Sequence, residues 1–206
     1  MSAVEKAAQS ATLPAIGDAY GGGFVIGITR DTETGVRRLH ITAGGGHELS
    51  GAWGKYGEKI AGADSFTDSR ANTEAMAAAG SEIAQKTLAL SIGGFDDWAI
   101  PARDVQELQY RNFKPTTAEN WQYGRSGDNP SSEPVGKLYS EENPAQTAHE
   151  VFRYGGPEAF KGRAYCSSSQ RSADYAFGMH FDGGYQENFT KSFEFLVRPV
   201  RSEIIQ

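Results

Sequence analysis

The sequence of 206 residues is long enough for one large domain, or for one domain that carries a sizeable insertion. Its 26 acidic and 20 basic residues give a formal net charge of -6, which argues against a nucleic-acid or anionic-membrane surface, because such a surface needs a basic stripe. The 25 glycines and the aromatic content of 11% favour turn-rich β structure with irregular loops over a helical bundle.

The single cysteine, Cys166, excludes a disulfide within the chain and any chemistry that needs two thiols. We expect it to be a buried thiol that packs as a small hydrophobic side chain. The N-terminus carries Glu5 and Lys6 and lacks the apolar run of about 7–15 residues that a secretion signal needs, so we expect a chain made in the cytoplasm. No stretch approaches the roughly 18 apolar residues of a membrane span, and we expect no membrane insertion.

The first half of the chain predicts a short arm and then a β-hairpin. Residues 1–16 are alanine-rich and polar and predict an N-terminal arm. An apolar run over 24–29 predicts a buried strand, the segment 31–35 predicts a turn, and alternation over 39–43 predicts a second strand. The glycine-rich stretch 44–70 predicts a loop.

Two helices are predicted in the middle of the chain. Apolar positions that step by three and four predict a helix over 73–90 with Asn72 as its N-cap, and a second helix over 103–113. Clusters of Pro, Ser and Asn then predict an inserted region over about 114–161, with one short helix that opens at Asn143-Pro144.

Alternation with period two returns near the C-terminus and predicts two further strands, joined through a turn at 182–184. In the first of them, this period places one set of side chains inward: Phe177, Met179 and Phe181. It places the opposite set outward: Asp174, His180 and Asp182. Tyr175 fits either face.

Three segments form a recognisable set, namely Gly93 to Pro101 (GGFDDWAIP), Tyr165 to Ser169 (YCSSS) and Val197 to Arg201 (VRPVR). Together with Gly17-Asp18, Ala52-Trp53-Gly54 and Asn72-Thr73, they resemble the Lcl C-terminal domain family, which is named for a bacterial collagen-like adhesin. The resemblance implies an α+β, C-type-lectin-like fold over 17–206, with two helices, small twisted antiparallel sheets and long inserted loops. Cys166 departs from the family, whose members commonly carry Trp there.

The segment 125–144, followed by the aromatic stripe at 175–185, is similar to family members borne by phages. The resemblance implies a non-enzymatic virion protein of the tail tip, fibre or baseplate region, made in the host cytoplasm. It further implies that the C-terminal lectin-like face binds a host surface receptor, either a glycan or a pilus protein. Other tail proteins are expected partners, a homo-oligomer is an open possibility, and no cofactor or metal is expected.

Two other functions stay open. One is a structural decoration or assembly protein of the particle that never touches the host. The other is an enzyme such as a hydrolase of surface glycans, although the usual motifs are missing. His47-Glu48 does not continue as H-E-x-x-H, and Ser167 to Ser169 lack the G-x-S-x-G surroundings of a nucleophile.

The candidate ligand-binding residues are aromatic side chains with amides, acids and a basic group around them, a combination that can hold sugars or protein surfaces without a metal. They are Gln170, Arg171, Asp174, Tyr175, His180, Asp182, Tyr185 and Gln186. A second set is expected to be structural: Asp96, Asp97, Trp98, Pro101, Arg198 and Arg201. In that set, the two aspartates would cap a turn, Trp98 would anchor the core, and the arginines would pair with buried acids such as Asp97. The serines 167–169 are expected in a loop, with their hydroxyls bonded to backbone.

Overall fold

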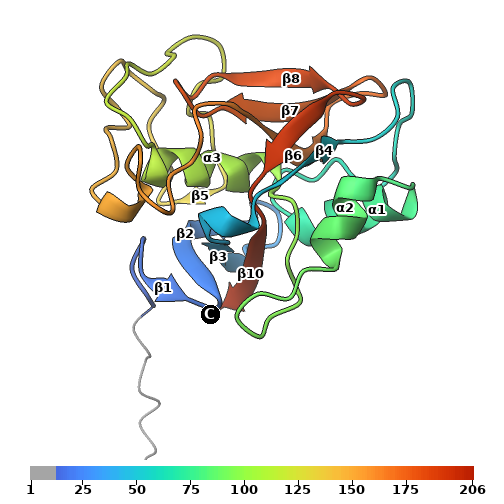
Figure 1. The fold of residues 1–206 in the computed structure, drawn as a ribbon, viewed down its shortest axis with the longest axis horizontal. Coiled ribbons are helices and arrows are strands. Elements are labelled where there is room, and N and C mark those ends of the chain that lie inside the picture. Colours follow the sequence, from blue (N-terminus) through green and yellow to red (C-terminus); the bar gives the residue numbers. More distant parts are fainter. Residues whose placement is uncertain (1–12) are drawn as a thin grey trace, which may run out of the picture.

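Two five-stranded sheets and three helices make up the mixed α+β fold, and the computed structural model describes residues 13–206 (Figure 1). Most of the expected N-terminal arm, residues 1–12, lies outside the described residues. The first sheet, here the terminal sheet, consists of β1 (Ala19–Tyr20), β2 (Gly23–Arg30), β3 (Arg37–Thr42), β5 (Ser132–Glu133) and β10 (Val200–Ile205). The second, here the upper sheet, consists of β4 (Leu49–Ala52), β6 (Ala164–Gln170), β7 (Tyr175–His180), β8 (Gln186–Thr190) and β9 (Glu194–Val197).

The strand order is β1-β2-β3-β10 in the terminal sheet, where β5 also pairs with β2, and β4-β9-β6-β7-β8 in the upper sheet. All pairs are antiparallel except β6 with β9. The helices are α1 (Ser69–Ala78), α2 (Glu82–Leu88) and α3 (Arg103–Phe113). Short 3-10 turns lie at Gly45–His47 and Glu150–Phe152. Helix α3 lies between the two sheets and contacts both (Figure 1).

The predicted hairpin is confirmed as β2 and β3. Asp31 shapes its turn, because the Asp31 carboxylate accepts hydrogen bonds from the backbone and the hydroxyl of Thr34, both at 2.7 Å. Gly35 completes the turn with a φ of 72°, a conformation that favours glycine. The stretch 44–70, predicted as a loop, also contains strand β4, so that part of the prediction is wrong.

The predicted single helix over 73–90 is wrong, because the chain forms α1 and α2 instead. Gly80 separates them with a φ of 90°, which an α-helix does not accommodate. The N-cap is Asp68, whose side chain accepts from the Ala71 backbone amide at 3.0 Å. Asn72 lies buried within α1, where its amide bonds Ser65. The predicted helix over 103–113 is confirmed as α3.

The predicted insertion over 114–161 is largely irregular in the structure, but no helix opens at Asn143-Pro144, so that detail is wrong. The Pro144 carbonyl accepts hydrogen bonds from the side chains of Asn120 at 2.9 Å and Lys114 at 3.2 Å. Side chains from the start of the inserted segment therefore hold this stretch of backbone, where a helix would use its own amides.

The structure tests the roles expected for Trp98, Pro101, Arg198 and Arg201. Trp98 is fully buried in the core, and Pro101 is buried too. Arg201 pairs with Asp97 at 2.7 Å as expected, although the Asp97 side chain is half-exposed. Arg198 also pairs with a buried acid as expected, in this case Glu48, at 2.7 Å.

The turn-capping role expected for Asp96 and Asp97 is wrong, since neither carboxylate accepts a backbone hydrogen bond within residues 13–206. Backbone bonds between Ile92 and Phe95 close that turn instead. Serines 167–169 lie in strand β6 and not in a loop. The hydroxyls of Ser167 and Ser169 do bond backbone, whereas that of Ser168 accepts from the Asn72 side chain. Ser167 donates to the Phe177 carbonyl at 2.8 Å.

The expectation that Cys166 is a buried thiol is confirmed, and burial raises its pKa. No helix within the described range 13–206 is long and apolar enough to cross a membrane.

The buried His40 should make stability depend on pH. Its ring nitrogens contact the Thr29 hydroxyl at 2.7 Å and the Ser202 hydroxyl at 2.8 Å. Burial, with a smaller contribution from Arg38, lowers the pKa of His40 from 6.5 to about 3. Below pH 6.5 the unfolded chain therefore protonates His40, whereas His40 stays neutral in the folded chain until the pH approaches about 3. The free energy of unfolding should fall by about 2–3 kcal/mol between pH 7 and pH 4.5, measured by urea denaturation.

His40→Gln keeps one donor and one acceptor but removes the titrating group. The decline over this pH interval should be smaller in that variant by the same amount. An identical decline in both proteins would contradict this account of His40.

Candidate functional site

An open groove of about 900 Å³ lies between the inserted segment and the turn that joins β7 to β8. We call it the aromatic groove and define it by six of its lining residues: Trp121, Tyr123, Glu141, His180, Asp182 and Tyr185. Three come from the inserted segment and three from the β7–β8 region. The groove therefore depends on two parts of the chain that are distant in sequence.

Exposed aromatic rings form one side of the groove. Trp121 is 46% exposed and Tyr123 is 66% exposed. The Trp121 ring lies 4.9 Å from that of Tyr185 and 5.4 Å from that of Tyr123, both edge to face. A contiguous cluster of large aromatic side chains at the surface is typical of a binding site, because exposed rings do not contribute to the packing of the core.

The backbone fixes the position of these rings. The Trp121 amide donates to the Gly183 carbonyl at 2.7 Å, which ties the inserted segment to the β7–β8 turn. In that turn Gly184 has a φ of 72°, and a Cβ there would lie 2.4 Å from the Tyr110 ring. Only glycine allows this close approach, so the turn rests directly on helix α3.

Carboxylates and a histidine supply polar groups beside the rings. The Gln122 amide donates to Glu141 at 3.0 Å, and His180 Nε2 lies 3.3 Å from a carboxylate oxygen of Glu187. Asp182 and Glu119 add two more acids to the lining. Acceptors next to flat apolar faces suit a ligand that carries many hydroxyl donors on a ring with apolar faces.

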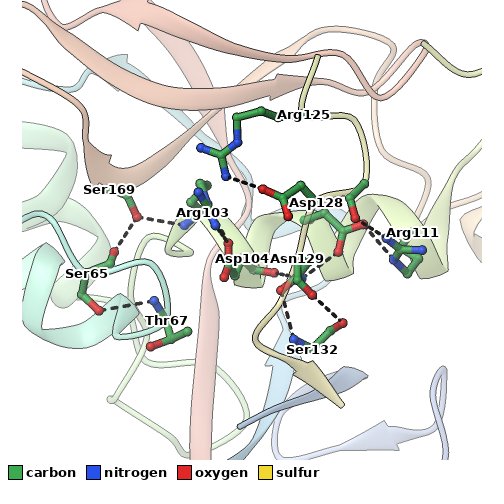
Figure 2. A network of polar contacts seen from close by, with 12 residues as sticks. Ser65, Thr67, Arg103, Asp104, Arg111, Arg125, Asp128, Asn129, Ser132 and Ser169 are labelled. Carbon is green, nitrogen blue, oxygen red and sulfur yellow. Dashed lines mark hydrogen bonds and ion pairs between the residues drawn. The ribbon is translucent and has the colours of Figure 1, made fainter. Parts of the chain in front are cut away.

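Buried polar side chains of α3 hold the inserted segment against the rest of the protein (Figure 2). Nine of the eleven residues of α3 are buried, most of them polar. Tyr110 donates to the Asn120 side chain at 2.8 Å, directly before Trp121. The Asn120 amide in turn donates to the backbone carbonyl of Ser140 at 3.1 Å.

Glu107 is the centre of this network. Its carboxylate accepts from Tyr139 and from Asn129, both at 2.7 Å, and lies 2.8 Å from Arg111. Arg111 also donates to the Gly127 carbonyl at 2.9 Å. Burial raises the pKa of Glu107, while Arg111 and the two hydrogen bonds oppose that rise.

The sequence-predicted ligand residues fall in four places. His180, Asp182 and Tyr185 meet in the aromatic groove. Arg171 and Gln186 line a neighbouring cavity of about 250 Å³. Asp174 and the exposed Tyr175 lie at the opposite end of β7, outside both hollows. Gln170 is buried and lines neither hollow.

The expectation that Gln170 is an exposed ligand residue is wrong. It is 3% exposed, and its amide bonds both the amide and the carbonyl of Ile60. Its oxygen also accepts from Lys191 at 3.0 Å. Strand β6 is buried from Tyr165 to Gln170, so the nearness of Gln170 in sequence to the exposed residues after it did not make it exposed.

Trp121, Tyr123 and Glu141 were not predicted as site residues. The available signal was the pair of aromatic residues Trp121 and Tyr123 in a polar segment with few other apolar side chains.

Within residues 13–206, no group of three His, Cys, Asp or Glu side chains is placed to hold a metal ion. Comparisons with protein families, with curated proteins and with solved structures found no match to this chain.

Glu107→Ala should loosen the inserted segment. Removing the carboxylate leaves Arg111 as an unpaired, largely buried charge and removes the partners of Asn129 and Tyr139. The free energy of unfolding should fall by about 3–5 kcal/mol in urea denaturation. Limited proteolysis of the folded variant should cut first within 118–149.

Glu74→Ala is the matched control, because it removes a half-exposed glutamate that pairs with Arg70 on α1. It should cost less than about 1 kcal/mol. Equal losses in the two variants would contradict a special role for Glu107.

Proposed function

We propose that the chain is a non-enzymatic carbohydrate-binding protein that recognises a glycan on a cell surface through the aromatic groove. The observation that carries this proposal is the fixed surface cluster of the exposed Trp121 and Tyr123 with the partly buried Tyr185, beside several carboxylates. Aromatic faces pack against the C–H faces of sugar rings, and carboxylates accept from sugar hydroxyls. Of the two receptor types expected from the sequence, a glycan fits this lining better than a pilus protein.

We further propose that the fold is C-type-lectin-like and related to the Lcl C-terminal domain family. Small antiparallel sheets, helices packed against them and a long irregular segment support this assignment. The sequence segments that resemble phage-borne members lead us to place the protein in a phage tail, where it would contact the host. Recognition of host glycans and attachment to other tail proteins belong to that same proposal.

The test is binding of the purified chain, displayed on beads in many copies, to intact bacteria and to oligosaccharides released from their surface. Multivalent display is needed because single sites of this kind are weak. Trp121→Ala and Tyr185→Ala should each reduce affinity about tenfold or more, as expected for aromatic anchors worth about 2 kcal/mol. Both variants should keep the melting temperature of the wild-type chain within a few degrees.

Tyr56→Ala is the matched control, because Tyr56 is 61% exposed and lies outside the groove. It should bind like the wild-type chain. Unchanged binding by both groove variants would contradict the groove as the site. Complete absence of saturable binding would favour a structural protein of the particle, and release of shorter oligosaccharides would show an enzyme.

A further inference from the structure

We propose that the cavity next to the aromatic groove is a second subsite, which binds a carboxylated sugar unit of the same glycan. This inference rests on the proposed function. We call this hollow the arginine cavity and define it by Arg103, Gln106, Arg125, Arg171, Phe177 and Asn188. Its volume is about 250 Å³, below the range of about 300–1,000 Å³ that is usual for larger organic ligands, so it suits a single ring.

Three arginines line this cavity. Arg103 pairs with the buried Asp104 at 2.6 Å, and Arg125 pairs with Asp128 at 3.1 Å (Figure 2). Arg171 forms no ion pair and no side-chain hydrogen bond within the described part of the chain. Its positive charge is therefore available to an anionic ligand.

Burial, and to a smaller extent a neighbouring positive charge, lowers the pKa of Arg103. Asp104 opposes this shift, and the neighbouring charge is that of Arg125. Figure 2 shows the Arg125 guanidinium just above that of Arg103, over the first turn of α3. A bound carboxylate would pair with Arg171, which forms no ion pair among residues 13–206, and guanidinium groups bind carboxylates through paired hydrogen bonds.

Two residues that line the cavity each have a buried polar side-chain atom without a hydrogen-bond partner among residues 13–206. Gln106 is 2% exposed, and its Nε2 is one of these atoms. The other is Oδ1 of Asn188. Buried polar atoms are nearly always hydrogen-bonded, so a free donor and a free acceptor in one cavity point to a ligand that offers both an oxygen acceptor and a hydroxyl donor. A carboxylated sugar has both.

The cavity also has an apolar surface and adjoins the groove. The Phe177 ring lies near two of the arginines, with Arg103 and Arg125 5.8 and 5.7 Å from its centre, and can contact a face of a sugar ring. Glu187 lines both hollows, and its carboxylate contacts His180 on the groove side. Neighbouring units of one glycan can therefore occupy both sites.

The test is a titration of the full chain with three acidic sugars, glucuronate, galacturonate and N-acetylneuraminate, followed by NMR at low ionic strength. At least one should shift the side-chain amide signals of Gln106 and Asn188, while glucose should not. Arg171→Gln should weaken that binding about tenfold or more. The control Arg38→Gln removes the same charge from strand β3 of the terminal sheet and should bind like the wild-type chain.

The outcomes separate the two proposals. If none of the acidic sugars shifts these signals while neutral oligosaccharides still bind the groove, the arginine cavity is not a subsite and the proposed function stands. Undiminished binding by Arg171→Gln, or a response to glucose 6-phosphate alone, would also overturn the carboxylate subsite. If neither neutral nor acidic glycans bind, the proposed function fails as well.

Discussion

The position of the inserted segment depends on the contacts of the buried Glu107 carboxylate. That segment has little regular structure between α3 and β6, so backbone ladders cannot hold it. Side-chain hydrogen bonds and ion pairs hold the segment instead. Glu107 contacts three of the side chains involved: Tyr139, Asn129 and Arg111. A buried network of this kind favours one arrangement over others, because a displacement would leave the buried Glu107 carboxylate without partners.

The groove follows from that constraint. Once the segment is fixed on α3, Asn120 bonds Tyr110, and the next residue, Trp121, is tied to the β7–β8 turn. The exposed rings are therefore positioned in advance, which lowers the entropic cost of binding a ligand. Because β8 lines both the groove and the arginine cavity, the same constraint also sets the distance between the two hollows.

Local signals predicted the local elements well. Helix α3 follows Pro101 and precedes Pro115, and the hairpin of β2 and β3 surrounds a clear turn. His180, Asp182 and Tyr185 were predicted correctly as neighbours because they lie within one strand and its turn. The partners of these residues were not predictable in the same way, since Trp121 and Tyr123 reach them only through contacts between distant parts of the chain. Gln170 was misplaced because it belongs to the buried strand β6, although it directly precedes the exposed Arg171 in the sequence.

The most direct measurement is an NMR titration of the indole N–H signals with oligosaccharide from cells that the protein binds. The chain has three tryptophans, and Trp53 and Trp98 are buried at 1% and 0% exposure, with their indole groups bonded to carbonyls. Of the three indole signals, we expect only that of Trp121 to shift, and the shift should saturate. A bound oligosaccharide that leaves the Trp121 signal unmoved would contradict this expectation.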